Sequence, residues 1–554
     1  MSDNGNTDEH GGTAMAERTP VLIVGAGPVG LAMALALWRQ GVPARILEAA
    51  EEPQHGSRAV QLHAPTLQIF ERLGILDEAE RRGLRVHHNS YHLSGGRTLR
   101  VELGSRNEPL MLPQQVTCEL LEAALERAGA RVERSTRVTE VSQDERLVTV
   151  KAEGPDGTVL IEADWLVVAD GVRSSIRDQL GIDFVGEQVP VNFLLAEGRI
   201  DGPFEPGAVH YFLGKNGGVV FASMPGGRIR VSAGVPEGYP FTPEGVQRLL
   251  DERGPRGLSV AGLDMINSFG SQERVAERLR VGRAFLVGDA AHTHSPLGGQ
   301  GLNLGLQDVH NLSWKLGGVI NGTLSPAVLD SYQPERLQAA REIVRNTHRF
   351  LKVFTLGPAA ARVRNTAWSA LEATGLLRRW FVPLLAGWRV AYPDVLGGAA
   401  AAPGRRTLPA GRTLPPAGHR APAWLPQAPA AGGAPFRLVT LGTADGGPEQ
   451  AGQALAERHP GMLAHDHLIG RRTGFLLLRP DGYVAAGGTT PAELARVPRL
   501  LARLAPCRTA RTTSWRSSGL RRRSRTGGEP CRPAPRRSRN RWRPQRRRPG
   551  RTAR

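Results

Sequence analysis

The chain has little cysteine, and this scarcity excludes several classes of protein. Its 554 residues include only Cys118, Cys507 and Cys531, too few and too scattered for a disulfide framework or a structural zinc site. The small unit at 436–506 has no CxxC pair for redox work, and a reducing cytoplasm is the expected compartment. No carboxylate or cysteine set accompanies His292 and His294, so the sequence predicts no metal.

Membrane and export signals are also missing. The uncharged run 21–38 is long enough to be considered as a transmembrane helix, yet it contains three glycines and Pro28, so we expect no membrane insertion. Residues 1–18 are polar and acidic and lack a basic n-region. They predict a short disordered leader rather than a secretory signal.

Net positive charge is nearly absent from the folded body, because most of the excess lies in the tail. The whole chain carries +19, but residues 508–554 hold 18 Arg and one Glu, a net charge of +17. The remaining 507 residues therefore carry only +2, which gives no electrostatic support for a nucleic-acid partner. The 507–554 tail has no apolar periodicity and is predicted to be disordered. Two interpretations of it stay open: a nucleic-acid-binding arm, or the product of a GC-rich gene read in a shifted frame.

What the chain does have is a glycine-rich stretch at 21–48 that organises the rest. An apolar strand leads into Gly25, Gly27 and Gly30 at GxGxxG spacing, with Pro28 inside the motif. An apolar helix follows, and a second apolar run ends at Glu48. In a dinucleotide site the glycines allow the tight turn, the approach of the pyrophosphate and close packing of helix on strand, while the acid binds a ribose diol. The pattern predicts dinucleotide binding at the helix N-terminus.

Two later stretches have the same strand-to-turn character. An apolar strand delivers Asp170 into a turn that contains Arg173, and another strand ends at Asp289 before a glycine cluster that opens a long helix. Strand ends of this kind are where open α/β sheets place their ligands. The glycine cluster Gly298, Gly299 and Gly301 offers backbone N–H groups to a negatively charged or carbonyl-rich ring. Each stretch taken alone is also compatible with an ordinary turn.

Between these stretches, the hydrophobic pattern changes to the period-2 alternation that is typical of strands. Residues 185–275 have period-2 patterning with Gly and Pro turns, which predicts an antiparallel sheet inserted into the first domain. Such a sheet can form the floor of a pocket, and ordinary sheet core is the equally weighted alternative for its side chains. The candidate substrate-binding residues are His210, Tyr211, Phe221, Met224 and Arg230.

The predicted domain organisation follows from these changes in composition. A Rossmann-type α/β domain covers 19–184 and 276–355, with 80–112 a candidate contributor to the inserted sheet of 185–275. The rest is a helical connector at 356–402, a Pro/Gly/Ala/Arg-rich linker at 403–435, a compact α/β unit at 436–506 and the tail at 507–554.

Three motifs together carry a family resemblance. GAGPVG at 25–30, DGVRS at 170–174 and GDAAHTHSPLGGQGLN at 288–303 resemble the single-component FAD-dependent aromatic hydroxylases of the para-hydroxybenzoate hydroxylase fold. The resemblance covers about 20–350. RPDGYVA at 479–485 is similar to the redox-inactive thioredoxin-like domain of the polyketide and phenol hydroxylase subgroup. One departure is at 64–68, where the family's Pro-Arg-Thr-Leu-Glu is replaced by Ala-Pro-Thr-Leu-Gln.

The resemblance implies roles for residues that spacing alone does not provide. Gly25, Gly27, Gly30 and Glu48 would bind the ADP half of FAD, and Asp289 would bind its ribityl side. Arg58 and Gln115 would contact the cofactor, Asp170 and Arg173 would belong to a motif linked to FAD and NADPH, and Pro296 with the 298–303 loop would line the flavin ring. No side chain is implied as an obligatory catalytic base.

The activity implied is aromatic hydroxylation. NADPH or NADH would reduce FAD, oxygen would give a flavin C4a-hydroperoxide, and its distal OH would pass to a phenolic ring, such as that of a polycyclic aromatic polyketide. Baeyer–Villiger insertion of oxygen on the same scaffold remains an alternative. The oligomeric state stays open, with a homodimer as one alternative.

Overall fold

The computed structural model describes residues 17–506, apart from short gaps at 54–58, 94–95, 203–204, 215–216, 296–297, 355, 394–395, 397–405, 408–412, 426–434, 444–445 and 471–472. The described residues all belong to one compact unit. Within them, no helix is both long and apolar enough to cross a lipid bilayer. The predicted tail at 507–554 and most of the predicted leader lie outside the described residues.

An eight-stranded sheet carries the predicted glycine motif. Its strands are β1 (Glu17–Val24), β2 (Ala44–Leu47), β8 (Val132–Glu133), β9 (Arg137–Gln143), β10 (Val148–Gly154), β11 (Gly157–Val168), β17 (Arg280–Val281) and β18 (Ala284–Leu286). In the order β18, β11, β1, β2 and β8 neighbouring strands are parallel, and β17 adds an antiparallel edge. The first half of β11 pairs instead with β10, which pairs with β9. The long strand β11 thus joins an antiparallel extension, formed by β9 and β10, to the parallel part of the sheet.

Helix α1 (Pro28–Trp38) connects β1 to β2 and is apolar on nearly every side. Such a pattern is typical of a helix buried all round. It contacts α4 (Gln114–Arg127) and α7 (Gln300–Ile320) as well as the strands beneath it. Because protein surrounds α1 along its length, its N-terminus is fixed at the carboxyl end of β1.

A second eight-stranded sheet is built mainly from the predicted inserted region. Its strands, in order, are β19 (His292–Thr293), β16 (Ser259–Ala276), β12 (Phe184–Asp201), β15 (Ile229–Val235), β14 (Gly217–Ser223), β13 (Ala208–Gly214), β5 (His88–Leu93) and β6 (Thr98–Glu102). All neighbours are antiparallel except β13 and β5. Strands β5 and β6 come from the earlier stretch 80–112, and β19 comes from the stretch that follows Asp289.

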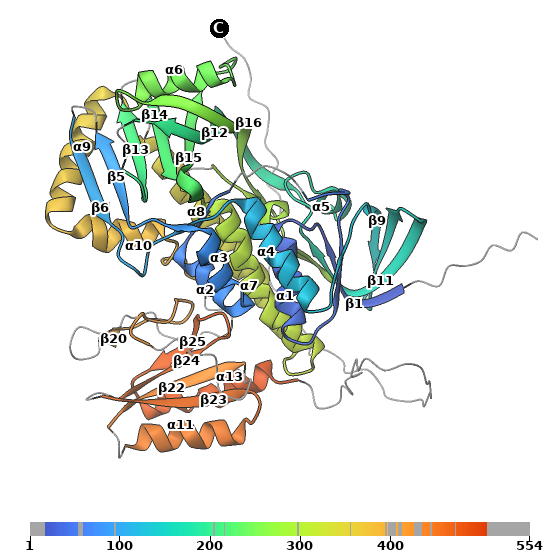
Figure 1. Cartoon of the computed structure of the whole chain (residues 1–554). Coiled ribbons are helices and arrows are strands. Elements are labelled where there is room, and N and C mark those ends of the chain that lie inside the picture. Colours follow the sequence, from blue (N-terminus) through green and yellow to red (C-terminus); the bar gives the residue numbers. More distant parts are fainter. Residues whose placement is uncertain are drawn as a thin grey trace, which may run out of the picture. The chain divides into compact units, whose positions relative to one another are not determined.

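The two faces of this second sheet pack against different helices. On one face, Phe212, Phe221 and Val231 join a core with α6 (Pro243–Arg253), which lies along the sheet in Figure 1. On the other face, Tyr91 and Tyr211 pack with residues of α9 (Pro358–Ala373) and the π-helix η4 (Leu377–Phe381).

Short elements connect the second face to the first domain. A small sheet has the order β3 (Gln61–Leu62), β7 (Leu110–Met111) and β4 (Leu84–Arg85), and Val60 and Met111 join the Tyr91 and Tyr211 core. The remaining helices of this part are α2 (Ala64–Leu73), α3 (Leu76–Arg82), α5 (Ser175–Gln179), α8 (Tyr332–Phe354) and α10 (Val382–Leu385), with 3-10 turns η1 (Pro225–Gly227), η2 (Gly288–Ala290) and η3 (Pro326–Ser331).

The C-terminal segment forms a four-stranded sheet with the order β23 (Leu463–Ile469), β22 (Phe436–Gly442), β24 (Gly474–Leu478) and β25 (Val484–Gly488). Helix α11 (Gly447–Arg458) packs on β22 and β23. The chain of this segment ends in two short helices, α12 (Pro491–Leu494) and α13 (Val497–Leu504), because Pro498 supplies no N–H and is accommodated in the first turn of a new helix. A short β20 (Arg406–Thr407) pairs with β21 (Thr413–Leu414), and Leu414 and Leu425 of the predicted linker pack into the C-terminal core.

A buried cluster of charges joins this C-terminal segment to helices α7 and α8. The Arg479 guanidinium donates two hydrogen bonds to Glu335, at 2.7 and 2.8 Å, and also binds Asp481. Lys315 Nζ donates to Glu335 at 2.7 Å and to Asn311 at 2.7 Å. The charged side chains are at most 2% exposed. Each charge is therefore neutralised by a partner rather than by water.

Candidate functional site

The three glycines of the first turn are glycine for different structural reasons. Gly25 has φ +102°, and a Cβ there would collide with the carbonyl of Ala169; a Cβ on Gly30 would collide with the carbonyl oxygen of Gly25. Those two glycines are required by the chain's own packing. Gly27 is not, because a Cβ there would meet no atom within 4 Å. The open space beside Gly27 is where a ligand can approach the backbone.

Backbone donors face that space. Gly27 is the N-cap of α1, and among the described residues no side chain caps this helix and no acid lies in its first turn. A helix end of this kind leaves N–H groups and the positive end of the dipole for an anion. Glu48, at the end of β2, accepts hydrogen bonds from Ala26 N at 2.7 Å and Ala50 N at 3.0 Å. Its carboxylate is thus held beside the glycine turn.

The second predicted turn lies next to the first, because β11 pairs in parallel with β1. Asp170 follows β11, and its Oδ1 is buried without a hydrogen-bond partner among the described residues. Burial raises the pKa of Asp170, against hydrogen bonds from Ser174 and the backbone that lower it. Gly171 has φ +83° and open space beside it, while Arg173 is exposed. A buried, unpaired carboxylate oxygen at a strand end fits a hydroxylated ligand.

The third turn lies beside the second, because β18 pairs in parallel with β11. Asp289 sits in η2 with an exposed side chain. Gly288 before it has φ +61° and lies against Val29 of α1. The Gly27, Asp170 and Asp289 turns therefore meet at one carboxyl edge of the sheet, the position at which open α/β sheets bind ligands.

Arg177 connects the second and third turns, and sequence reasoning did not assign it a role. Its guanidinium donates to Val172 O and to Ala290 O, both at 3.2 Å, and lies 4.1 Å from the centre of the Phe184 ring. One buried cation thus fixes the distance between the Asp170 and Asp289 turns. The signal in the sequence was only its place in α5, three residues after the N-cap Ser174, whose side chain accepts from Arg177 N.

Asp308 fixes the third turn from behind. Its buried carboxylate accepts from Gly288 N at 2.9 Å, His292 Nε2 at 2.7 Å and Arg336 Nε at 2.6 Å. Burial alone would raise the pKa of Asp308, but His292 and Arg336 keep it below its usual value. His292 therefore belongs to an ion-paired support for the turn that carries Asp289.

Residues 298–303, called the 298–303 loop below, consist of the turn at Gly298 and Gly299 and the first turn of α7, and they are fixed by β3 and the segment that follows it. The Asn303 amide donates to Gln61 O at 2.7 Å and to Gly299 O at 2.6 Å, and it accepts from Thr66 Oγ1 and His63 N at 2.7 Å. His63 Nε2 lies 2.8 Å from Gly298 O, and burial lowers the pKa of His63 to about 4, so the ring is neutral at pH 7. His63 is a further residue that sequence reasoning missed.

The positions of the remaining predicted cofactor residues add little to the description of the site. Arg58 and Pro296 lie outside the described residues. Gln115 is in the first turn of α4, where its amide donates to Glu119 at 3.2 Å. Leu302 is buried in the first turn of α7.

The predicted substrate residues do not share one face. All five are buried, but Phe221 packs toward α6, and His210 pairs with it across β13 and β14 and stacks on Phe212. Tyr211 and Met224 pack on the opposite face, and Arg230 is beside Ala222 of that face, with its guanidinium bound to Glu197. The second group lies on the face whose core includes Val60 and Met111, next to β3 and the 298–303 loop. The sheet thus brings only part of the predicted set toward the candidate cofactor site.

Comparison with known proteins identifies the family. The model of the "FAD binding domain" family matches residues 18–347. The chain belongs to the FAD-binding monooxygenase family. The enzyme is 31% identical over 526 residues to 6-methylpretetramide 4-monooxygenase of Streptomyces rimosus, with 88% of this chain and 94% of the relative covered.

Solved structures of relatives share the fold of this monooxygenase. Anhydrotetracycline hydroxylase OxyS of Streptomyces rimosus matches with a TM-score of 0.67 and 28% identity, covering 88% of this chain and all of that one. Aklavinone-11 hydroxylase, solved with FAD and aklavinone, matches with a TM-score of 0.69 and 25% identity, covering 88% and 98% of the two chains. The FAD cofactor of the family fits the residues present: open backbone at Gly27, an unpaired oxygen on Asp170 and the exposed Asp289.

Proposed function

We propose that the enzyme hydroxylates a phenolic ring of a polycyclic aromatic polyketide, using FAD, molecular oxygen and NADPH or NADH as transient reductant. Relatives named for 6-methylpretetramide, anhydrotetracycline and aklavinone support this substrate class and a role in antibiotic biosynthesis. The observation that carries the proposal is the meeting of three strand-end turns around the open space at Gly27. When bound there, the flavin supplies the redox and oxygen chemistry.

The residues of the chain bind and orient the two reactants. Backbone N–H groups at the start of α1 would receive the pyrophosphate, Glu48 and Asp289 would bind hydroxyl groups, and the 298–303 loop would border the flavin ring. Asn303 and His63 hold that loop through side-chain and backbone hydrogen bonds. A rigid loop would help to exclude water from the reacting centre, so that reductant is not wasted as hydrogen peroxide.

The substrate would lie beside the part of this sheet face that adjoins β3 and β7, since Tyr211 and Met224 themselves are buried in the core that includes η4. Tyr91 and Tyr211 stack with ring centroids 4.9 Å apart, and this face adjoins β3 and β7. An apolar, aromatic surface suits a fused-ring substrate, since aromatic rings pack in offset or edge-to-face geometry. The small C-terminal segment, which we propose to be thioredoxin-like, would have a structural role.

A visible spectrum of the purified protein tests the cofactor. We expect a yellow protein with flavin absorption that oxidises NADPH faster when an aromatic polyketide or phenol is present. A colourless protein that takes up no added FAD would overturn the proposal. NMR of the product separates ring hydroxylation from Baeyer–Villiger insertion, which gives a product of the same mass.

Replacing Asp289 by alanine should weaken FAD binding about 10- to 100-fold, the equivalent of one charge-assisted hydrogen bond. Dissociation constants from the quenching of flavin fluorescence measure the effect. The control is Asp201→Ala, an exposed aspartate at the end of β12, which should bind FAD like the wild type. Full flavin occupancy of the Asp289 variant at limiting FAD would contradict the role given to this residue.

A further inference from the structure

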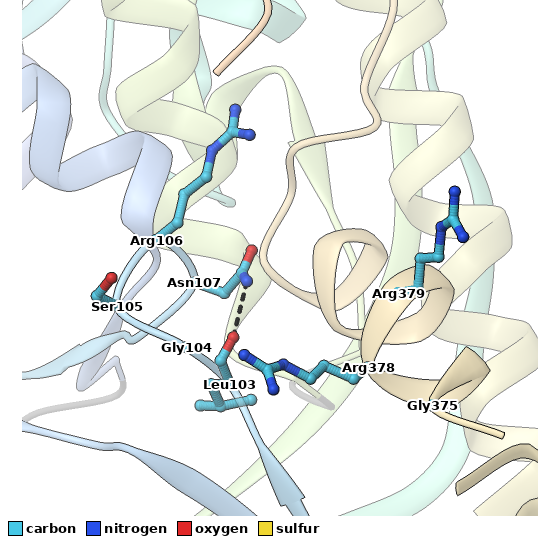
Figure 2. Close-up of a pocket in the computed structure, with 8 residues that line it drawn as sticks. All are labelled: Leu103, Gly104, Ser105, Arg106, Asn107, Gly375, Arg378 and Arg379. Atoms are coloured by element: carbon cyan, nitrogen blue, oxygen red, sulfur yellow. Dashed lines mark hydrogen bonds between the residues drawn. The ribbon is translucent and has the colours of Figure 1, made fainter. Parts of the chain in front are cut away.

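A pocket of about 430 Å³ shares no lining residue with the three turns, and it is lined in part by positively charged residues. Two segments form it: the loop 103–107 after β6, and the residues around η4. Figure 2 shows both segments. The lining residues are Leu103, Gly104, Ser105, Arg106, Asn107, Gly375, Arg378 and Arg379. Three are arginines, and none of these described lining residues is acidic.

The two walls are built structures rather than loose loops. Asn107 N donates to Gly104 O and Asn107 Nδ2 donates to Leu103 O, both at 2.8 Å, and Figure 2 draws the second bond. Gly104 has φ +73°, and a Cβ there would lie 3.4 Å from Arg378 Nη2. On the other wall, Leu377 is buried in the core, so the following two arginines face outward. Both walls therefore have defined backbone geometry.

The second wall has an uncommon backbone. Residues Leu377–Phe381 form a π-helix, and it carries Arg378 and Arg379. π-Helical turns are rare and occur frequently at functional sites, where they change the direction in which side chains point. This conformation is an observation independent of the charge of the pocket.

Positive charge extends beyond the pocket wall. The Arg106 guanidinium lies 4.6 Å from the centre of the Trp388 ring, and Arg420 lies 5.6 Å from the same centre. Burial lowers the pKa of Arg106, and the nearby Arg420 lowers it further. Arg100 Nε donates to the Glu102 carboxylate at 2.7 Å and, together with the nearby Arg378, lowers the pKa of Glu102. This neighbouring carboxylate therefore already has a partner. A concave site lined by one sign of charge concentrates ions of the opposite sign.

Each wall also leads to the loop that would border the flavin. Loop 103–107 continues into β7, which pairs with β3, and Gln61 of β3 accepts from Asn303. The η4 segment continues through α10 to Leu385, whose carbonyl accepts from Gln300 Nε2 at 2.8 Å. The pocket is therefore connected through a few residues on both sides to the 298–303 loop.

We propose that this pocket binds the phosphate groups of the nicotinamide coenzyme. Arginine is the side chain that best matches phosphate, because its planar group donates two parallel hydrogen bonds. Of the two small molecules that must reach the flavin, the dinucleotide carries phosphates, whereas a polycyclic phenol carries at most weakly acidic hydroxyls. The inference rests on the proposed function, because it requires a reductant that visits a flavin.

The test uses the flavin-loaded enzyme and the double variant Arg378→Gln/Arg379→Gln. The control for the loss of two charges is Arg248→Gln/Arg256→Gln, which changes two exposed arginines in and just after α6. Adenosine 2′,5′-bisphosphate is the binding probe, titrated by calorimetry without turnover. We expect its dissociation constant to rise about 10-fold or more in the double variant, as for the loss of a charge-assisted hydrogen bond. The control should bind like the wild type.

Steady-state kinetics identify the group that is bound. A higher KM for NADPH alone, with kcat retained, supports binding of the 2′-phosphate, and a higher KM for both NADPH and NADH supports binding of the pyrophosphate. An unchanged coenzyme KM with a higher KM for the aromatic substrate assigns the arginines to a substrate anion and overturns the proposal, as does no change in any constant. A wild-type enzyme that carries FAD but oxidises neither coenzyme contradicts the proposed function instead.

Discussion

Replacing Glu335 by glutamine should lower the free energy of unfolding by about 3–5 kcal/mol, the usual cost of removing one partner from a buried ion pair. Glu335 accepts hydrogen bonds from Arg479, Lys315 and Asn311. The NH2 group of a glutamine would face the N–H groups of these three side chains and could not accept their hydrogen bonds. Arg479 and Lys315 would then have Asp481 as the remaining anion of the cluster. Urea unfolding followed by circular dichroism measures the loss. The control is Glu372→Gln, an exposed glutamate on α9, which should change stability by less than about 0.5 kcal/mol.

The same cluster predicts how stability depends on pH. Burial alone would raise the pKa of Glu335, but Arg479 and Lys315 lower it from 4.5 to about 2. A depressed carboxyl pKa stabilises the folded state above the ordinary pKa, and this contribution disappears as pH falls from about 4.5 to about 2. It amounts to about 3 kcal/mol. In the Glu335→Gln variant the pH dependence of unfolding in this window should be weaker by that amount; an unchanged profile would show that Glu335 is not the titrating group.

Replacing Gly27 by alanine should abolish flavin retention while leaving the apoprotein as stable as the wild type. Gly27 has φ −68°, which alanine adopts without strain, and its added methyl group would meet no protein atom within 4 Å. The methyl group would occupy the space proposed for the pyrophosphate and displace it from the helix N-terminus. Loss of two charge-assisted hydrogen bonds corresponds to about 100-fold or more in the dissociation constant for FAD.

Flavin content after purification, titration of apoprotein with FAD and the unfolding temperature of the apoprotein measure both halves of this expectation. The comparison variant is Gly30→Ala, whose methyl group would collide with the carbonyl of Gly25. It should lower the stability of the apoprotein itself. If Gly27→Ala retains FAD at wild-type affinity, the cofactor does not approach the backbone at this glycine.

Local patterns in the sequence predicted the elements that carry the three turns, because each turn directly follows its own apolar strand. The predicted strand before Asp289 is observed at Ala284–Leu286, and the glycine cluster does open a long helix. The order of β18, β11 and β1, which brings the turns together, is set by pairing between strands over 100 residues apart. Family resemblance, rather than spacing, supplied that arrangement.

The sequence could not predict the contacts that depend on distant partners. Arg177 and Ala290 are 113 residues apart, and Arg479 and Glu335 are 144 apart, so no local pattern indicates that they meet. The candidate substrate residues show a different difficulty. His210 and Tyr211 are consecutive in β13, and consecutive side chains of a strand point to opposite faces. Period-2 patterning places them on opposite faces, but it does not indicate which face adjoins the cofactor.

The buried charge cluster also determines how this chain can be recombined with its relatives. Arg479 and Asp481 lie in the C-terminal segment, whereas their partners Asn311, Lys315 and Glu335 lie on α7 and α8. A chimera that exchanges only the C-terminal segment would bury charges without partners unless the five positions are exchanged together. The C-terminal segment is therefore not an independent module of this enzyme, and calorimetry should record a single cooperative unfolding transition that includes both parts.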